Sequence, residues 1–223
     1  MKKSLKTLLT LGIAAISAGT LASCGMDPVT TRFEAEDAEF ITVESENPQA
    51  QSITVEAAAE GDEISNGFSV GYFTTAEESL KFKITSDREA KAVEAKFALA
   101  SAAMNIKENS AGSKMATFTL GDQYKLTVNG QEIDLSKVVI TPKEEEGMNY
   151  KDYSEYTITF DLKKGENVIL FTKIEGEQLE AEEGYSSAMG NGVNVDYLEI
   201  TAAANLTWEK TAGNYEVKTE DAE

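Results

Sequence analysis

The sequence has 223 residues, of which 39 are acidic and 20 are basic, so its formal net charge is −19, and it contains no histidine and one cysteine. A chain this acidic repels nucleic acid and anionic lipid. Without histidine it cannot carry a Ser-His-Asp triad or a His-ligated zinc, copper or iron site, so a metal site would have to use oxygen ligands, which favours calcium or magnesium.

The first 23 residues have the organisation of an export signal. Three lysines, Lys2, Lys3 and Lys6, precede an apolar run at 8–18 and a stretch of small residues. Because the apolar run is too short to span a bilayer as a helix, we expect residues 1–23 to be a signal peptide that takes no part in the fold. Without its three lysines the chain has 17 basic against 39 acidic residues, a net charge of −22.

The end of this signal, Leu21-Ala22-Ser23-Cys24, resembles the bacterial lipoprotein box, in which the cysteine thiol receives a lipid and becomes the new N-terminus. The resemblance implies lipidation of Cys24 and anchoring by acyl chains. Several acyl chains anchor a protein stably to a membrane, whereas a single chain binds the membrane only reversibly. We therefore expect a membrane-anchored protein of the cell envelope, facing outside the cytoplasm at the cell surface. The alternative is an ordinary secretory peptide cleaved near Ala22, which leaves Cys24 as a free thiol.

Behind a spacer at residues 24–31, most of the chain alternates apolar and polar residues with a period of two. Such runs, separated by polar or glycine-bearing turns, predict one all-β domain over residues 32–201, built as a sandwich or a barrel. The expected strands lie at residues 32–36, 40–43, 52–57, 68–73, 79–84, 92–100, 116–120, 124–128, 156–162, 166–172 and 193–201.

Two turn signals and two loops interrupt these runs. Asn129-Gly130 stands between two apolar runs and predicts a type I′ hairpin, whose two central residues both need positive φ. Lys164-Gly165 predicts a second hairpin-like turn. Residues 141–154 and 175–192 have the composition of loops.

A C-terminal extension covers residues 202–223. Its apolar residues Leu206, Trp208, Tyr215 and Val217 are able to add one or two further strands, and its acidic end is expected to be disordered.

Carboxylates stand at alternate positions in the first expected strand. Glu34 and Glu36 would share one side of it, about 7 Å apart, while Asp37 would face water on the other side. Asp196 interrupts an apolar run that resembles a buried last strand, and first and last strands of a sandwich commonly pair. The three carboxylates could therefore meet around a calcium ion, which takes six to eight oxygen ligands. The alternative is that the glutamates lie on the surface of an edge strand.

Five segments, in this order, resemble carbohydrate-binding modules of families 6 and 35: "RFEAEDAEF", "SNGFSVGYF", "YKLTVNG", "GENVILF" and "VNVDYLEI". The resemblance covers nearly all of the chain behind the signal, from Arg32 to Thr201. It implies a β-sandwich of jelly-roll type. It also implies a structural calcium ion held by Glu34, Glu36 and Asp196 together with backbone carbonyls, tying the first strand to the last.

In these modules sugar binds in loops at one end of the sandwich, where aromatic rings stack on the sugar and amides bond to its hydroxyls. The matching positions are Asn194, Asn191 and Tyr185, with Tyr72, Tyr150 and Tyr153 as further aromatic candidates. For each tyrosine the alternative is packing in the core or at its rim. For Asn194 the alternative is turn or strand-entry chemistry.

The leading functional hypothesis is a lipid-anchored, non-catalytic protein that binds polysaccharide or another glycan, meets the membrane only through its lipid and does not bind nucleic acid. An adhesin-like or scaffolding sandwich that has lost sugar binding is the alternative. A glycoside hydrolase is less favoured, although such enzymes need only two carboxylates about 5 to 10 Å apart, because the module resemblance already claims nearly all of the chain.

Overall fold

The computed structural model describes residues 26–44, 52–108, 112–143, 149–190 and 192–211. The signal peptide, Cys24 and Asn191 lie outside the described residues. None of the helices in the described ranges has the length and apolar character needed to cross a membrane.

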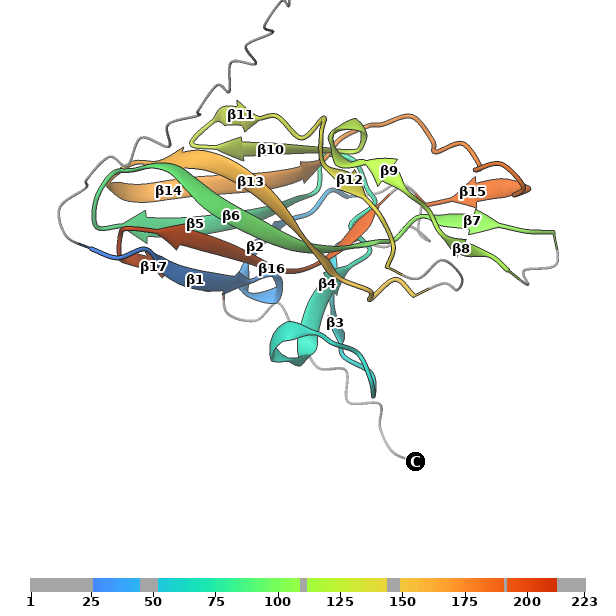
Figure 1. Cartoon of the computed structure of the whole chain (residues 1–223), viewed down its shortest axis with the longest axis horizontal. Coiled ribbons are helices and arrows are strands. Elements are labelled where there is room, and N and C mark those ends of the chain that lie inside the picture. Colours follow the sequence, from blue (N-terminus) through green and yellow to red (C-terminus); the bar gives the residue numbers. More distant parts are fainter. Residues whose placement is uncertain (1–25, 45–51, 109–111, 144–148, 191, 212–223) are drawn as a thin grey trace, which may run out of the picture.

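Most of the described chain forms two antiparallel sheets, packed face to face (Figure 1). The first sheet contains β13 (Ser154–Leu162), β6 (Ala90–Ser101), β16 (Val193–Ala202), β4 (Phe68–Gly71) and β3 (Thr54–Ala57), with β1 (Val29–Glu34) also paired to β16. The second contains β11 (Gln131–Ile133), β10 (Tyr124–Val128), β14 (Gly165–Lys173), β5 (Ser79–Ser86) and β17 (Leu206–Trp208), with β2 (Glu39–Ile41) also paired to β5. The expected all-β class and jelly-roll type of β-sandwich are confirmed.

Two smaller sheets extend the sandwich. One contains β15 (Ser187–Met189), β7 (Met104–Ile106) and β8 (Lys114–Met115), and it lies at the right-hand end of the molecule in Figure 1. The other pairs β12 (Val139–Ile140) with β9 (Phe118–Thr119). The sequence pattern did not predict β7, β8, β12 and β15, which are only two or three residues long and carry no clear alternation.

Aromatic rings fill the space between the two main sheets. Phe171 of β14 packs against Tyr124, Phe73 and Phe97, with ring centroids 4.8 to 5.5 Å apart. Trp208 of β17 stacks on Phe82 at 6.1 Å. The one tryptophan is therefore partly buried against the core, and the strand allowed for by Leu206 and Trp208 exists.

The two glycine turns differ in what they connect. Asn129 and Gly130 have φ values of 55° and 81°, and they join β10 to β11 in one sheet, so the predicted hairpin is confirmed. The turn before Gly165 does not form a hairpin, because β13 pairs with β6 in the first sheet whereas β14 pairs with β10 and β5 in the second. Alternation alone cannot show that a short turn leads from one sheet into the other.

Strand β16 positions the site residues. It is almost wholly buried and pairs with β1, β6 and β4, which confirms the expected pairing of the first strand with the last. Between Val195 and Leu198 the strand has two residues opposite the single Ala98 of β6. This β-bulge redirects the side chains of Asp196 and Tyr197, as extra residues in a strand commonly do.

Candidate functional site

A cluster of carboxylates lies where β1 meets β16. The strand ends at Glu34, and Ala35–Asp37 form a 3-10 helix, so the expectation that Glu34 and Glu36 alternate along one strand is wrong. The 3-10 helix buries Glu36 completely, and it still brings the Glu36 side chain into the carboxylate cluster. Asp196, 2% exposed, reaches the cluster from the bulge in β16.

The segment before β4 supplies hydrogen-bond donors to this cluster. The Ser65 hydroxyl donates to Glu34 Oε1 at 3.0 Å, and the Ser65 backbone N–H lies 3.1 Å from both carboxylate oxygens of Asp196. The Asn66 amide donates to Glu36 Oε1 at 3.0 Å. Three carboxylates from distant parts of the chain are therefore held by two consecutive residues.

Burial makes these carboxylates hard to ionise. Loss of water raises the pKa of Glu36 to about 7 and that of Asp196 to about 6. The pKa of Glu34 is raised for the same reason, although its bond from Ser65 and the nearby Arg32 act in the opposite direction. At all three carboxylates the loss of water therefore outweighs the contacts that favour the charged form.

The cluster has the chemistry of a calcium site and part of its arrangement. All donors are oxygen atoms, and Glu34 Oε2 is buried without accepting a hydrogen bond from any described residue. However, no group of three acidic side chains in the described ranges is arranged to hold a metal ion. Glu34 and Asp196 share Ser65, whereas Glu36 is turned toward Asn66.

Asp37 differs from its expectation of facing water. It is 4% exposed and pairs with the Lys210 ammonium group, while its backbone oxygen accepts a bond from the Thr211 N–H at 2.8 Å. The expectation failed because it assumed a strand, in which neighbouring residues face opposite sides. In the 3-10 helix, Glu36 and Asp37 both turn inward.

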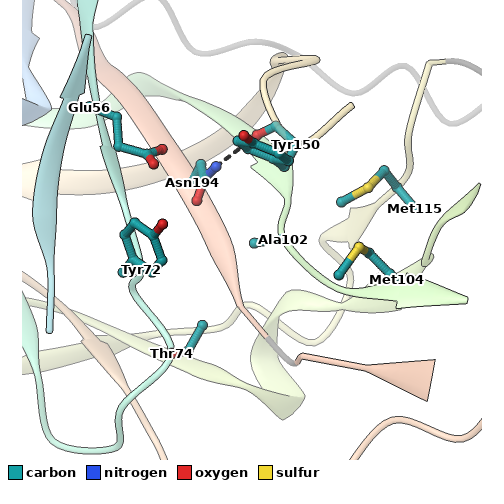
Figure 2. A pocket seen from close by; sticks show the side chains of 8 residues that line it. All are labelled: Glu56, Tyr72, Thr74, Ala102, Met104, Met115, Tyr150 and Asn194. Carbon is teal, nitrogen blue, oxygen red and sulfur yellow. Dashed lines mark hydrogen bonds between the residues drawn. The ribbon is translucent and has the colours of Figure 1, made fainter. Parts of the chain in front are cut away.

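A separate pocket of about 240 Å³ lies between the edge of the first sheet and the three-stranded sheet (Figure 2). Its lining comes from β3, β7, β8, β16 and three loops, and consists of Glu56, Tyr72, Thr74, Ala102, Met104, Met115, Tyr150 and Asn194. Asn194 and Tyr72, which the sequence indicated as ligand-binding residues, are therefore brought together, as is the further candidate Tyr150.

Two tyrosines present rings at this pocket. Tyr72 is 40% exposed and Tyr150 is 48% exposed, and Figure 2 shows them on opposite sides of Asn194. Tyr72 adopts φ of 54°, a left-handed conformation that is unusual for a bulky residue. Such a conformation costs on the order of 1–3 kcal/mol and commonly marks functional positions.

Asn194 joins the pocket to its surroundings. Its side chain is buried, and its Nδ2 donates to the backbone oxygen of Tyr150 at 2.8 Å, which fixes that loop against β16. Next to it, the Val193 N–H donates to the Tyr124 hydroxyl at 2.9 Å, and this hydroxyl donates to the Phe73 backbone oxygen. Tyr124 thus ties the strand that carries Asn194 to the loop that carries Tyr72.

Glu56 supplies the carboxylate of the pocket. It lies over Gly71, where a Cβ atom would be 2.4 Å from Glu56 Oε2, so a glycine is needed for this approach. Burial raises the pKa of Glu56, and no described residue donates a hydrogen bond to its carboxylate. Lys151 acts on it only through space, since its ammonium group bonds to Ala57 O at 2.9 Å and pairs with Asp62 at 3.3 Å.

Sequence reasoning missed Glu56, Met104 and Met115. Glu56 has the pattern of an ordinary polar position in an alternating strand, and nothing nearby in the sequence shows that its side chain reaches over Gly71 of the neighbouring strand. The two methionines are cross-strand partners in β7 and β8, neither of which was predicted.

The other candidates lie elsewhere. Tyr185 is absent from the pocket lining, and its ring lies 5.1 Å from the Lys107 ammonium group and 5.3 Å from that of Lys114. Tyr153 is 7% exposed and packs with Tyr197 and the alanines of β6 on the outer face of the first sheet. Asn191 is not among the described residues.

No family model matches the sequence, and no curated protein matches it. Solved structures similar to this chain include a family 35 carbohydrate-binding module from Clostridium thermocellum, 19% identical with a TM-score of 0.46, which covers 77% of this chain and 97% of that one. A family 35 module from Paenibacillus barcinonensis is 17% identical with a TM-score of 0.46, covering 77% and 98% of the two chains. The C-terminal family 6 module of a laminarinase from Zobellia galactanivorans is 14% identical with a TM-score of 0.45, covering 78% and 99%. Modules of families 35 and 6 are thus what the chain resembles both in its motifs and among solved structures.

Proposed function

We propose that this protein binds carbohydrate without catalysis, in the pocket between Tyr72 and Tyr150. The observation that carries the proposal is the combination of two exposed rings, a buried amide and a carboxylate around one hollow. Tyrosine rings stack on the apolar face of a sugar, and Asn194 and Glu56 are suited to bind its hydroxyl groups. Met104 and Met115 add a polarisable apolar wall.

The lining also bears on catalysis. Glycoside hydrolases need a pair of carboxylates about 5 to 10 Å apart across the scissile bond. Among the described residues that line the pocket, Glu56 is the one carboxylate. Binding without hydrolysis is therefore the function that this pocket supports best.

The carboxylate cluster supports a second part of the proposal, a structural calcium ion. Glu34 and Asp196 would hold it from the two paired strands, with Glu36 turning from Asn66 to join them. Such an ion would neutralise buried charge and bind only the folded chain, which stabilises the fold. Chelation should then lower the melting temperature of the protein, and an unchanged melting temperature would contradict a bound ion.

Lipidation of Cys24 and display at the cell surface complete the proposal. Their support is the order of basic, apolar and small residues that ends in Leu-Ala-Ser-Cys. Mass spectrometry of the N-terminal peptide from membrane extracts should find acyl chains on Cys24. A Cys24→Ser variant should instead be recovered without them.

The binding proposal is tested with the mature chain carrying Cys24→Ser, applied to immobilised galactan, mannan, xylan, laminarin and cellulose. We expect retention on at least one of them, with Tyr72→Ala and Tyr150→Ala each weakening it about tenfold or more. Tyr185→Ala is the matched control, because that ring is outside the pocket lining. No retention on any of these glycans would contradict the proposal and favour a scaffolding role.

A further inference from the structure

The charged group in the described lining of the proposed sugar pocket is a carboxylate. Among the described residues that line it, Glu56 is the one with a charge, and the nearby Lys151 ammonium group is occupied by Ala57 and Asp62. The remaining lining side chains are two tyrosines, two methionines, a threonine, an alanine and an asparagine. The described lining of the pocket therefore offers no cation to a ligand.

The carboxylate of Glu56 lies close against a glycine of the neighbouring strand. It leans across from β3 onto Gly71 of β4, at the position that a side chain would otherwise fill. It is half-buried, so bulk water and salt screen its charge less than that of a surface glutamate. A ligand with its own negative group would meet this charge at close range.

We propose that Glu56 makes the pocket selective for uncharged sugars and against sugars that carry a carboxylate or a sulfate. This inference rests on the proposed carbohydrate binding at the same pocket. The carboxylate accepts hydrogen bonds from sugar hydroxyls, which an uncharged sugar supplies. Against an acidic sugar the same group acts by repulsion, and specificity commonly needs such a repulsive element.

Matched pairs of polysaccharides isolate this effect. The probes are galactan, mannan and laminarin, each tested beside a form whose primary hydroxyl groups have been oxidised to carboxylates. We expect the mature Cys24→Ser chain to bind the unoxidised form of a retained glycan at least about tenfold more tightly than its oxidised form. Calorimetry or affinity electrophoresis measures the ratio of the affinity for the unoxidised glycan to the affinity for its oxidised form.

Two variants separate charge from shape. Glu56→Gln keeps the size of the side chain and an acceptor oxygen, so the ratio should fall to about threefold or less. Glu60→Gln removes the same charge from an exposed position outside the pocket lining and should leave the ratio unchanged. In the unaltered protein, raising the salt concentration from about 0.05 M to about 0.5 M should also narrow the ratio.

The outcomes distinguish the two proposals. If an oxidised glycan binds as tightly as its parent, selectivity by Glu56 is wrong while carbohydrate binding stands. If discrimination persists unchanged in Glu56→Gln and at high salt, steric exclusion causes it and the role of Glu56 is wrong. If no parent glycan is retained, carbohydrate binding itself fails and this inference fails with it.

Discussion

The carboxylate cluster and the pocket both bury acidic groups, but they surround them differently. In the cluster, Glu36 and Asp196 are buried and Glu34 is partly buried, and the donors of Ser65 and Asn66 are directed at them. In the pocket, Glu56 receives no donor from the described residues and faces an open hollow between two tyrosines. The difference is in keeping with the two proposed roles, a structural ion at the first site and a bound sugar at the second.

The largest expected effect is a pH dependence of stability that calcium reverses. Because the folded-state pKa values of Glu36 and Asp196 are raised to about 7 and about 6, folding favours their protonated forms. In the presence of a chelator, the contribution of these two carboxylates to the free energy of unfolding should therefore be greatest below about pH 4 and fall as pH rises toward about 7, by on the order of 3 kcal/mol from Glu36 alone. Denaturant titrations at a series of pH values measure this.

The proposed calcium ion should change the sign of that slope, because it would bind the ionised carboxylates. Glu36→Gln is the matched variant: it keeps the acceptor for Asn66 but removes the charge, so its slope with chelator should be flatter. We also expect it to raise stability with chelator at neutral pH and to lower it with calcium. An identical slope in both proteins would show that the general charge of the chain causes the pH dependence.

The second-largest expected effect comes from removing a hydroxyl group that supports the pocket but is not part of its lining. Tyr124→Phe removes the hydroxyl between Val193 N and Phe73 O, leaving a buried donor and a buried acceptor without their partner. We expect a loss of about 2 kcal/mol in the free energy of unfolding and several-fold weaker glycan binding. Thermal unfolding and calorimetry on one preparation check both. Unchanged binding in a destabilised variant would show that the two loops hold their positions without this bond.

The smallest expected effect is that of a substitution at Gly71, which tests whether this glycine positions Glu56. Gly71→Ala places a Cβ atom 2.4 Å from Glu56 Oε2, and the backbone of Gly71 does not have positive φ, so the carboxylate rather than the strand should move. We expect glycan affinity to fall about threefold to tenfold while the free energy of unfolding changes by less than about 1 kcal/mol. Gly67 is the contrasting position, because a Cβ atom there would meet nothing within 4 Å but its φ is 78°. Alanine at Gly67 should reduce stability and leave binding unchanged.

Alternation and turn chemistry were enough to predict the all-β class, the position of most strands and the hairpin at Asn129-Gly130. Alternation of polar and apolar residues reports directly on which face of a strand is buried, and a type I′ turn requires the residues found there. The bulge in β16 is also visible in the sequence once the structure is known. Its core residues Val193, Val195, Leu198 and Ile200 are two positions apart except across Asp196-Tyr197, where they are three apart. That Asn194 and Tyr72 share a site followed only from family resemblance.

The tertiary contacts settled the rest. They showed that Glu36 and Asp37 leave the strand in a 3-10 helix, that the turn before Gly165 joins two sheets, and that Glu56 lies in the pocket. Each of these depends on which segments distant in sequence come to lie side by side. Local patterns specify the conformation and burial of a residue, but the neighbours that a carboxylate meets are set by the packing of the whole chain.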